Sequence, residues 1–391
     1  MSAPIFYTTS VALDAGGGQT TRVIEHCRVL AAEAPVRLFA PQPPPGLPDL
    51  PFTRVPVPAR PPRDLGFQVR LARALIREGR RTPPALIYSY AGSLNLGPRL
   101  AAWRLGCPLA LELHGLHALE YGLEHRRTAT LRARQLAYAA MFRLDMLLAD
   151  GVVAVTDQLA ARARAAGARS TLTAPNGVNP RHFLPTDGAT ARRAEGFADD
   201  EVVIGFVGNL AGWQGLDTLL RGLALALPRA PRLRLLLIGT GSQERLLRAL
   251  AAELGIEERI VWAGRVPYAD VPRRLSAADV LAGPFAANER NAATGVSPLK
   301  VFEYLALGRP ILVSDLPGLE FVAAEGAGGL FRADDPVDLA RKLIAFAALP
   351  PAARAAYGRR ARSLAEERYS WEQISGRILA YAATLAPDGQ R

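Results

Sequence analysis

Lys300 and Glu303 lie three residues apart, so they share one face of the helix predicted after Ser297. Pro298 suits the first helical turn, where its missing N–H group costs no hydrogen bond. Free N–H groups at Ser297 and Leu299, together with the Lys300 ammonium, could hold a diphosphate. Glu303, one turn deeper, could accept hydrogen bonds from two hydroxyls of a ribose. The alternative is a solvent-facing ion pair of little consequence.

Lys300 also stands out by composition. Only Lys300 and Lys342 are lysines among the 47 basic residues, and the rest are arginines. The formal charge of +11 attracts anions. However, the arginines are scattered along the chain and form no stripe with interleaved aromatic residues, so we expect no nucleic-acid partner. Codon bias toward arginine is the simplest cause of the charge.

Two glycine-bearing junctions in the second half could approach a phosphate. Gly208 follows a strand in "VVIGFVGNLAG", and Gly241 follows another in "LLLIGTGSQ". Each junction leads into a helix, whose N-terminus favours anions. Two such junctions in one domain are more than turn chemistry requires.

The first junction, "DAGGGQTT", holds Gly16, Gly17 and Gly18 before a helix. These glycines serve either phosphate approach or a tight turn with positive φ. A dinucleotide fingerprint would need a third glycine where Thr21 stands and an acidic residue after the second strand. Both are missing, which argues against a dehydrogenase.

His114 follows a predicted strand in "LALELHG", at the functional edge of a parallel sheet. This position favours a role for His114, whereas His117 lies further into the loop. No pair of histidines has metal-ligand spacing on a helix, and no carboxylates cluster, so we expect no metal site. We assign no role to three further histidines, which are His26, His125 and His182.

Strand-like and helix-like runs alternate along the chain, which predicts an α/β fold of two doubly wound parallel-sheet domains. A segment rich in Pro, Gly and Asn predicts a linker near residues 180–197. We therefore expect an acceptor-binding domain over 1–185, a nucleotide-sugar-binding domain over 186–370 and a C-terminal helix over 371–391 packing toward the first domain. Ligands of such sheets bind beyond the carboxyl ends of the strands, so we expect a cleft between the domains.

The composition is that of a folded protein, with 49% hydrophobic and 21% charged residues among 391. Two cysteines cannot form a disulfide framework. Neither a signal peptide nor a long apolar run is visible, so we expect a cytoplasmic protein.

The ordered motifs resemble a known family. The series "GGGQTT", "LELHG", "APNGV", "FVGNLAGWQGLDTLL", "LIGTGSQERL", "WAGRVPYADVPRRLSAADV" and "SPLKVFEYLALGRPIL" is similar to the retaining glycosyltransferases of family four, which have the GT-B fold. The resemblance runs from about residue 5 to residue 385. It implies a second domain that binds a nucleotide-sugar and a first domain that binds the acceptor.

The resemblance also implies roles for single residues. His114 and Lys300 would be catalytic, His114 approaching the transferred sugar. The implied donor-binding residues are Gly208, Asn209, Gln214, Gly241, Arg265, Val266, Ser297, Leu299, Lys300 and Glu303, with Arg265 and Val266 bordering the base and Glu303 holding the ribose. The implied acceptor-binding residues are Gly16, Gly17, Gly18, Tyr90 and His114.

This sequence departs from the family pattern at three positions. The family's phosphate-binding Arg and Lys align with Asn209 and Gln214, and the first of its paired glutamates aligns with Gly295. A subgroup with "WHG" and "SPLK" motifs is similar, and its lysine would supply the missing cation. Lys300 is that lysine here.

The expected activity is transfer of a hexose from a nucleoside-diphosphate sugar to an acceptor hydroxyl, with retention at the anomeric carbon. The acceptor is a glycan, a glycolipid or a small molecule, and no cofactor or metal is required. The alternative is a weak or inactive subunit that binds sugar nucleotide and supports a partner transferase. An epimerase would need acids and bases on both sugar faces, and a glycosidase two opposed carboxylates; neither set is apparent.

The segment "GLHALEYGLEHRRTATLRARQ" mixes apolar residues with four arginines, which are Arg126, Arg127, Arg132 and Arg134. It is either a surface that docks peripherally on the anionic inner face of a membrane or an ordinary basic helix face.

Overall fold

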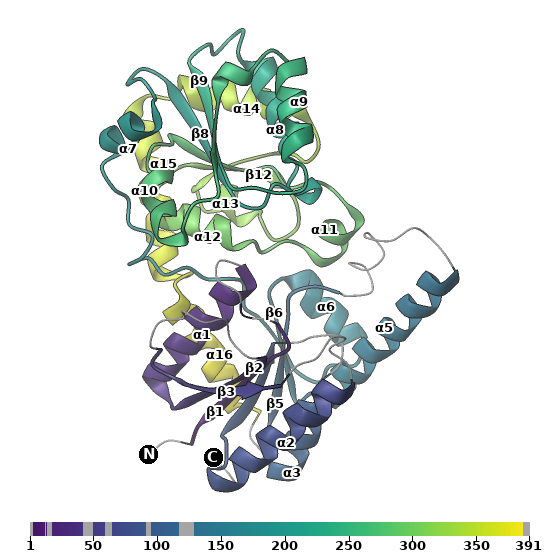
Figure 1. The fold of residues 1–391 in the computed structure, drawn as a ribbon. Helices are drawn as coiled ribbons and strands as arrows, with labels where there is room; N and C mark the ends of the chain where they lie inside the picture. The colour runs from purple at the N-terminus through teal and green to yellow at the C-terminus, as the bar shows by residue number, and fades with distance from the viewer. Residues whose placement is uncertain are drawn as a thin grey trace. The chain divides into compact units, whose positions relative to one another are not determined.

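The computed structural model describes residues 3–11, 13, 18–41, 50–58, 65–90, 95–116 and 129–385, with the side chains of residues 65 and 129–134 left aside. The chain forms two compact units. Unit 1 holds Met1–Asn176 and Trp371–Arg391, and unit 2 holds Gly177–Ser370 (Figure 1). Each unit has its own hydrophobic core. The chain passes from unit 1 to unit 2 after Asn176, earlier than the predicted boundary at residue 185.

Unit 1 is built, in the described residues, on a seven-stranded parallel sheet in the order β3-β2-β1-β4-β5-β6-β7. Its central strands are buried along their whole length because helices cover both faces. The strands are β1 (Ile5–Thr9), β2 (Val36–Pro41), β3 (Thr53–Val57), β4 (Leu86–Tyr90), β5 (Leu109–Leu113), β6 (Gly151–Ala154) and β7 (Thr171–Thr173).

Two helix layers cover this sheet. In Figure 1, α1 and α16 lie together on one side, and α2, α3 and α5 lie on the other. The C-terminal helix α16 thus belongs to unit 1. The described helices of unit 1 are α1 (Gly18–Glu33), α2 (Leu65–Arg81), α3 (Leu96–Leu105), α5 (Ala129–Leu148), α6 (Asp157–Ala165) and α16 (Trp371–Ala383).

Unit 2 holds a six-stranded parallel sheet in the order β10-β9-β8-β11-β12-β13, counted over its described residues. Both units are therefore doubly wound, as predicted. The strands are β8 (Val202–Val207), β9 (Leu233–Ile238), β10 (Ile260–Gly264), β11 (Val280–Gly283), β12 (Ile311–Asp315) and β13 (Gly328–Arg332).

The helices of unit 2 include one inside the segment predicted as a linker. This is α7, which Asp187 caps by accepting the N–H groups of Ala189 and Thr190. The helices are α7 (Gly188–Glu195), α8 (Leu216–Ala226), α9 (Glu244–Glu253), α10 (Val271–Leu275), α11 (Glu289–Thr294), α12 (Leu299–Ala306), α13 (Phe321–Ala324), α14 (Pro336–Ala348) and α15 (Pro351–Glu367), with short 3-10 turns η1 (Gly212–Gln214), η2 (Glu257–Arg259) and η3 (Tyr268–Asp270).

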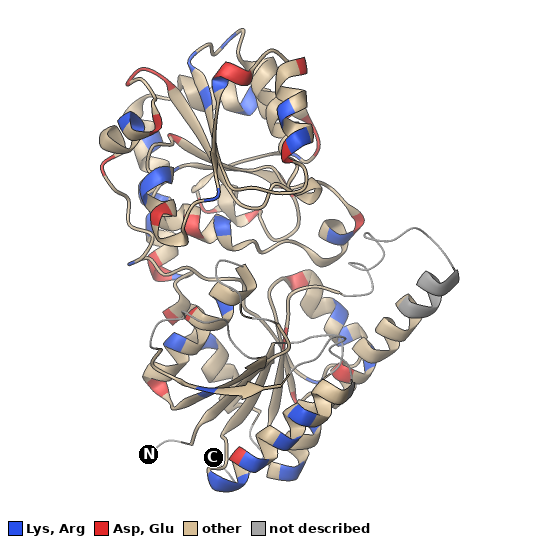
Figure 2. Ribbon diagram, in the orientation of Figure 1, with Lys and Arg blue, Asp and Glu red and all other residues tan. Residues whose placement is uncertain are grey.

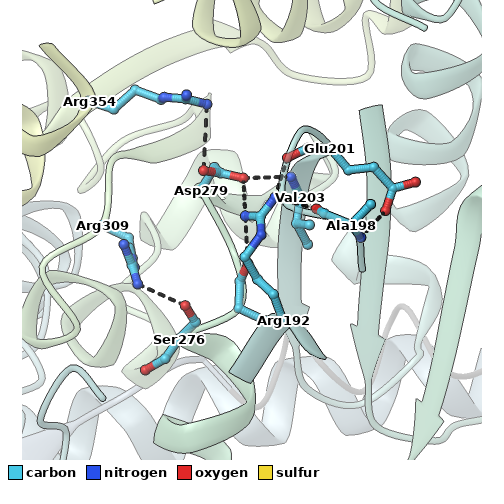
Figure 3. Close-up of polar contacts among 9 residues, drawn as sticks. Arg192, Ala198, Glu201, Val203, Ser276, Asp279, Arg309 and Arg354 are labelled. Atoms are coloured by element: carbon cyan, nitrogen blue, oxygen red, sulfur yellow. Dashed lines mark hydrogen bonds and ion pairs between the residues drawn. The ribbon is translucent and has the colours of Figure 1, made fainter. Parts of the chain in front are cut away.

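Asp279 organises the amino-terminal edge of the second sheet (Figure 3). Its Oδ2 accepts the N–H of Val203 at 2.8 Å and Nη1 of Arg192, from α7, at 2.8 Å. Nη1 of Arg354, from α15, lies 3.5 Å from Oδ1. This carboxylate ties two helices to the strand edge opposite the carboxyl ends. Elsewhere, Lys and Arg are spread over the helices of both units (Figure 2).

Candidate functional site

Two glycines shape the turns at the carboxyl ends of β8 and β9. Gly208 follows β8 with φ +147°, and Gly239 follows β9 with φ +133°. These backbone conformations favour glycine. A Cβ on Gly239 would also collide with the carbonyl oxygen of Gly208. The two turns therefore pack closely and leave room beside Gly208.

The Lys300 ammonium fills that room. Its Nζ donates to Gln214 Oε1 at 2.8 Å and lies 3.8 Å from the ring centroid of Phe206. A Cβ on Gly208 would collide with Nζ. Lys300 is 8% exposed, and Gln214 is its only hydrogen-bond partner among the described residues. Burial lowers the pKa of Lys300 to about 7, against the opposing charge of Glu303.

Glu303 lies one turn further along α12 and is 7% exposed. The Tyr268 hydroxyl donates to its Oε1 at 2.8 Å. Burial raises the pKa of Glu303 to about 7, although the hydrogen bond from Tyr268 and the charge of Lys300 oppose the shift. Because both side chains are buried, the alternative of a solvent-facing ion pair is excluded.

The other predicted donor-binding residues lie in loops of unit 2. Asn209 and Gly241 follow β8 and β9, and a Cβ on Gly241 would collide with Asn209 Oδ1. The β10 strand is followed by exposed Arg265 and half-buried Val266. Helix α12 begins at Leu299 with Pro298 as its N-cap residue and Ser297 just before it. The carboxyl-end loops of three strands and the start of α12 thus carry the predicted set.

Gly295, which the resemblance aligns with the family's first glutamate, has φ +65° and ψ 177°. This region of backbone space is essentially restricted to glycine. The loop backbone at this position therefore requires glycine, so a glutamate could not stand here without a change in the path of the loop.

In unit 1, His114 directly follows β5. Its Nε2 lies 2.9 Å from Glu112 Oε1, and its ring stacks on Tyr90, the last residue of β4, with centroids 4.3 Å apart and planes at 16°. The His114 side chain is 19% exposed, whereas Glu112 is fully buried. The orientation of the His114 ring is thus fixed by the Glu112 carboxylate at Nε2 and by the Tyr90 ring on one face.

Sequence reasoning missed the buried cluster around Glu112. Arg22 of α1 forms an ion pair with Glu112 and donates to Asn176 Oδ1. Burial alone would raise the pKa of Glu112, but Arg22 and His114 hold it well below its ordinary value. The guanidinium of Arg22 also lies 5.3 Å from the ring of Trp371, at the start of α16. A signal was present, because a glutamate inside the apolar strand "LALEL" needs a buried partner.

Several predicted residues lie outside the described part of the chain. Gly18 is described as the exposed first residue of α1. The residues Gly16, Gly17, His117, His125, Arg126 and Arg127 fall outside it, as do the side chains of Arg132 and Arg134, so the predictions for them stay predictions.

No group of three or more His, Cys, Asp or Glu side chains in the described residues could hold a metal ion. None of the described helices is both long and apolar enough to cross a membrane. The expectation of a metal-independent reaction stays a prediction.

Two family models match the chain, and together they span most of it. The model of Glycosyltransferase Family 4 matches residues 16–182, and the model described as Glycosyl transferases group 1 matches residues 201–348.

Curated relatives match over part of their length. A GDP-mannose-dependent monoacylated alpha-(1-6)-phosphatidylinositol monomannoside mannosyltransferase of Corynebacterium glutamicum is 29% identical over 209 residues, which are 52% of this chain and 54% of the relative. A D-inositol 3-phosphate glycosyltransferase of Streptomyces avermitilis is 31% identical over 289 residues, 70% of this chain and 59% of the relative. The chain spans about half the length of the curated relatives it matches.

Solved structures share the fold over almost the whole chain. Sucrose-phosphate synthase from Thermosynechococcus elongatus has a TM-score of 0.75 at 22% identity, covering 98% of this chain and 99% of that one. Anabaena HepE, solved in complex with UDP, has a TM-score of 0.74 at 19% identity, covering 97% and 100%. With these matches and its two doubly wound sheets, the chain belongs to the group-1, family-four glycosyltransferases of GT-B fold.

Proposed function

We propose that the protein transfers a hexose from a nucleoside-diphosphate sugar to an acceptor hydroxyl, with retention at the anomeric carbon. The observation that carries this proposal is the Lys300 ammonium. It is buried against Phe206 and Gln214 beside the start of α12, with no carboxylate paired to it in the described residues. A diphosphate would supply the missing negative charge, assisted by N–H groups at the start of the helix.

The contact between Lys300 and Gln214 supports this assignment. By the family resemblance, the phosphate-binding lysine would align with Gln214, so Lys300 would bring an ammonium to the side chain that stands in its place. Asn209, at the position of the family's arginine, would offer a neutral donor. Glu303 would hold the ribose, and Arg265 with Val266 would border the base.

In the proposed reaction, the bond between the anomeric carbon and the diphosphate oxygen breaks, and a bond from that carbon to the acceptor oxygen forms on the same face. The acceptor proton passes to the leaving diphosphate. No protein nucleophile takes part, so catalysis rests on positioning and on charge stabilisation. Lys300 would meet the negative charge that develops on the leaving group.

The acceptor and the transferred sugar are assigned to residues of unit 1. The His114 ring stacks on the buried Tyr90 ring at the ends of two neighbouring strands, and its side chain is the partly exposed member of the pair. Glu112 accepts a hydrogen bond from His114 Nε2–H, which orients the imidazole ring at the end of β5. Relatives that act on phosphatidylinositol mannosides and on inositol phosphate motivate a polyol or glycolipid acceptor.

The first test is thermal stabilisation by GDP, UDP, GDP-mannose and UDP-glucose, since a bound ligand raises the melting temperature by mass action. We expect at least one nucleotide to stabilise the protein and its sugar conjugate to turn over. Nuclear magnetic resonance of the product then reports the anomeric configuration. An inverted product would overturn retention, and binding without turnover would favour the non-catalytic subunit.

We also propose peripheral docking on an anionic membrane. Leu136, Leu144 and Leu147 are exposed along α5, and Leu136 directly follows the arginine-bearing segment in the sequence. Flotation with anionic liposomes tests this proposal. We expect binding at low salt that high salt reverses, and binding that is absent or insensitive to salt would contradict electrostatic docking.

A further inference from the structure

We propose that Tyr268 is a positioning residue for the ribose: its hydroxyl fixes the Glu303 carboxylate in the orientation that receives the ribose hydroxyls. This inference rests on the proposed function, because it deepens the role of Glu303 in donor binding. It identifies a side chain to which neither the sequence motifs nor the comparisons give a role.

The geometry around Glu303 carries the inference. The Tyr268 hydroxyl donates to Oε1 at 2.8 Å. No described residue donates a hydrogen bond to Oε2, so one oxygen is held and the other is left for a ligand. A glutamate has three rotatable side-chain bonds, and fixing one oxygen removes much of that freedom before the ligand arrives.

Tyr268 is itself held by two aromatic rings. Its ring stacks on the ring of His182, with centroids 5.0 Å apart and planes at 18°. It also forms a T-shaped contact with the ring of Phe183, with centroids 5.5 Å apart. Both neighbours come from the first residues of unit 2, far from η3 in sequence. This clamp keeps the hydroxyl near Glu303, although Tyr268 is 38% exposed.

The same contact also acts on ionisation. Burial raises the pKa of Glu303 to about 7, and the charges and donors that oppose the shift are Lys300 and Tyr268. A hydrogen bond from Tyr268 favours the carboxylate, which accepts two hydroxyls, over the neutral acid. Removing it therefore raises the pKa of Glu303 further.

A competing role would give the opposite result. If the Tyr268 hydroxyl merely occupies the place of a ribose hydroxyl, the nucleotide must displace it. Removing the hydroxyl would then tighten ribonucleotide binding, whereas removing a positioning group weakens it.

The experiment compares GDP and UDP with their 2′,3′-dideoxy counterparts on wild type and Tyr268→Phe, by calorimetry. Phenylalanine keeps the stack on His182 and removes only the hydroxyl. We expect wild type to bind the ribonucleotide more tightly than the dideoxynucleotide. In Tyr268→Phe this affinity ratio should be roughly tenfold smaller, which is the effect of losing one hydrogen bond to a charged group. Dideoxynucleotide affinity should stay unchanged.

The ratio of ribonucleotide affinity to dideoxynucleotide affinity reports the contribution of Glu303 alone. Both ligands carry the same diphosphate, so the contact of Lys300 with the diphosphate cancels in the ratio. This ratio should rise with pH, and its midpoint should lie higher in Tyr268→Phe than in wild type. The matched control is Tyr357→Phe, whose ring packs on Phe346 in the same unit. We expect it to leave both the ratio and its midpoint unchanged.

The outcomes separate the inference from the proposed function. Wild type that binds none of the nucleotides overturns the proposed function. Wild type that prefers ribose, with Tyr268→Phe showing the same preference and midpoint, overturns the inference alone. Tighter ribonucleotide binding by the variant also overturns it, in favour of the displaced hydroxyl.

Discussion

Lys300 keeps an ionisable nitrogen in an apolar setting, over the Phe206 ring and against the amide oxygen of Gln214. Burying a charge without a direct ion-pair partner is costly, so burial lowers the pKa of Lys300 to about 7 against the opposing charge of Glu303. A bound diphosphate would reverse this effect, because a nearby anion favours the protonated amine. The same residue therefore links ligand binding, proton binding and charge stabilisation.

Replacing Lys300 should reduce turnover more than donor affinity. An interaction that strengthens as the leaving group gains charge lowers the barrier, so Lys300→Ala should reduce kcat by roughly 10² or more. Lys300→Arg should restore little of the rate, since a longer planar guanidinium does not fit the site of a compact ammonium. Steady-state kinetics at saturating donor provide the measurement. Nearly full kcat in Lys300→Arg would contradict the role of Lys300 in stabilising the leaving diphosphate, and Arg265 would be the next candidate for that role.

Proton uptake should accompany nucleotide binding above neutral pH. In the free protein Lys300 loses its proton as pH rises through about 7, and the diphosphate should raise that pKa again. Below about pH 7 Glu303 becomes protonated instead, so affinity should pass through a maximum near neutrality. Calorimetry in two buffers of different ionisation enthalpy counts the protons at pH 8. Lys300→Arg should take up none there, because arginine is always charged; equal uptake in this variant would contradict the assignment.

The residues that complete each site could not be found from the sequence. Lys300, Glu303 and His114 could be singled out, because their local spacing and position after strands are visible. Their partners come from elsewhere in the chain, as Tyr268 does for Glu303 and Arg22 does for His114 through Glu112. Such long-range pairs depend on the fold.

At the scale of elements, the buried pair of Arg22 and Glu112 joins α1 to β5. Removing one partner of a buried ion pair leaves an uncompensated charge. Glu112→Gln should therefore destabilise unit 1 by about 3 to 5 kcal/mol. Denaturant unfolding, followed by a probe in each unit, measures this change.

The control for that variant is Glu25→Gln, which breaks a more exposed pair between Glu25 and Arg28 on the same helix. We expect a loss below about 1 kcal/mol there. Equal decreases in the free energy of unfolding for the two variants would mean that the buried pair stabilises unit 1 no more than the exposed pair does.

The sequence predicts the strands that are clear apolar runs and misses the two edge strands of the sheet in unit 1. The sequence predicts all six strands described in unit 2, because they are apolar runs bounded by glycine or by turns: "VVIGFVG", "LRLLLIG", "IVWAG", "DVLAG", "PILVS" and "GGLF". In unit 1, β3 was missed because Pro56 argues against a strand, although proline is tolerated at an edge. The other missed edge strand, β7, has only three residues.

At the scale of the whole molecule, the reaction should proceed without a divalent cation. No metal-binding cluster exists in the described residues, and Lys300 with helix N–H groups can hold the diphosphate. Turnover should therefore be unaffected by EDTA. Activity that EDTA abolishes, and that Mg²⁺ or Mn²⁺ restores, would show that the diphosphate needs a metal.

The discontinuity of unit 1 has a consequence for biosynthesis. Its helix α16 follows the whole of unit 2 in the sequence, yet Trp371 lies over Arg22. A ribosome delivers residues in order, so unit 2 can fold while the nascent chain still lacks the helix that packs on α1. Until then, the buried charges of Arg22 and Glu112 are incompletely covered. Chaperones and proteases therefore have longer access to unit 1 than to unit 2 during synthesis.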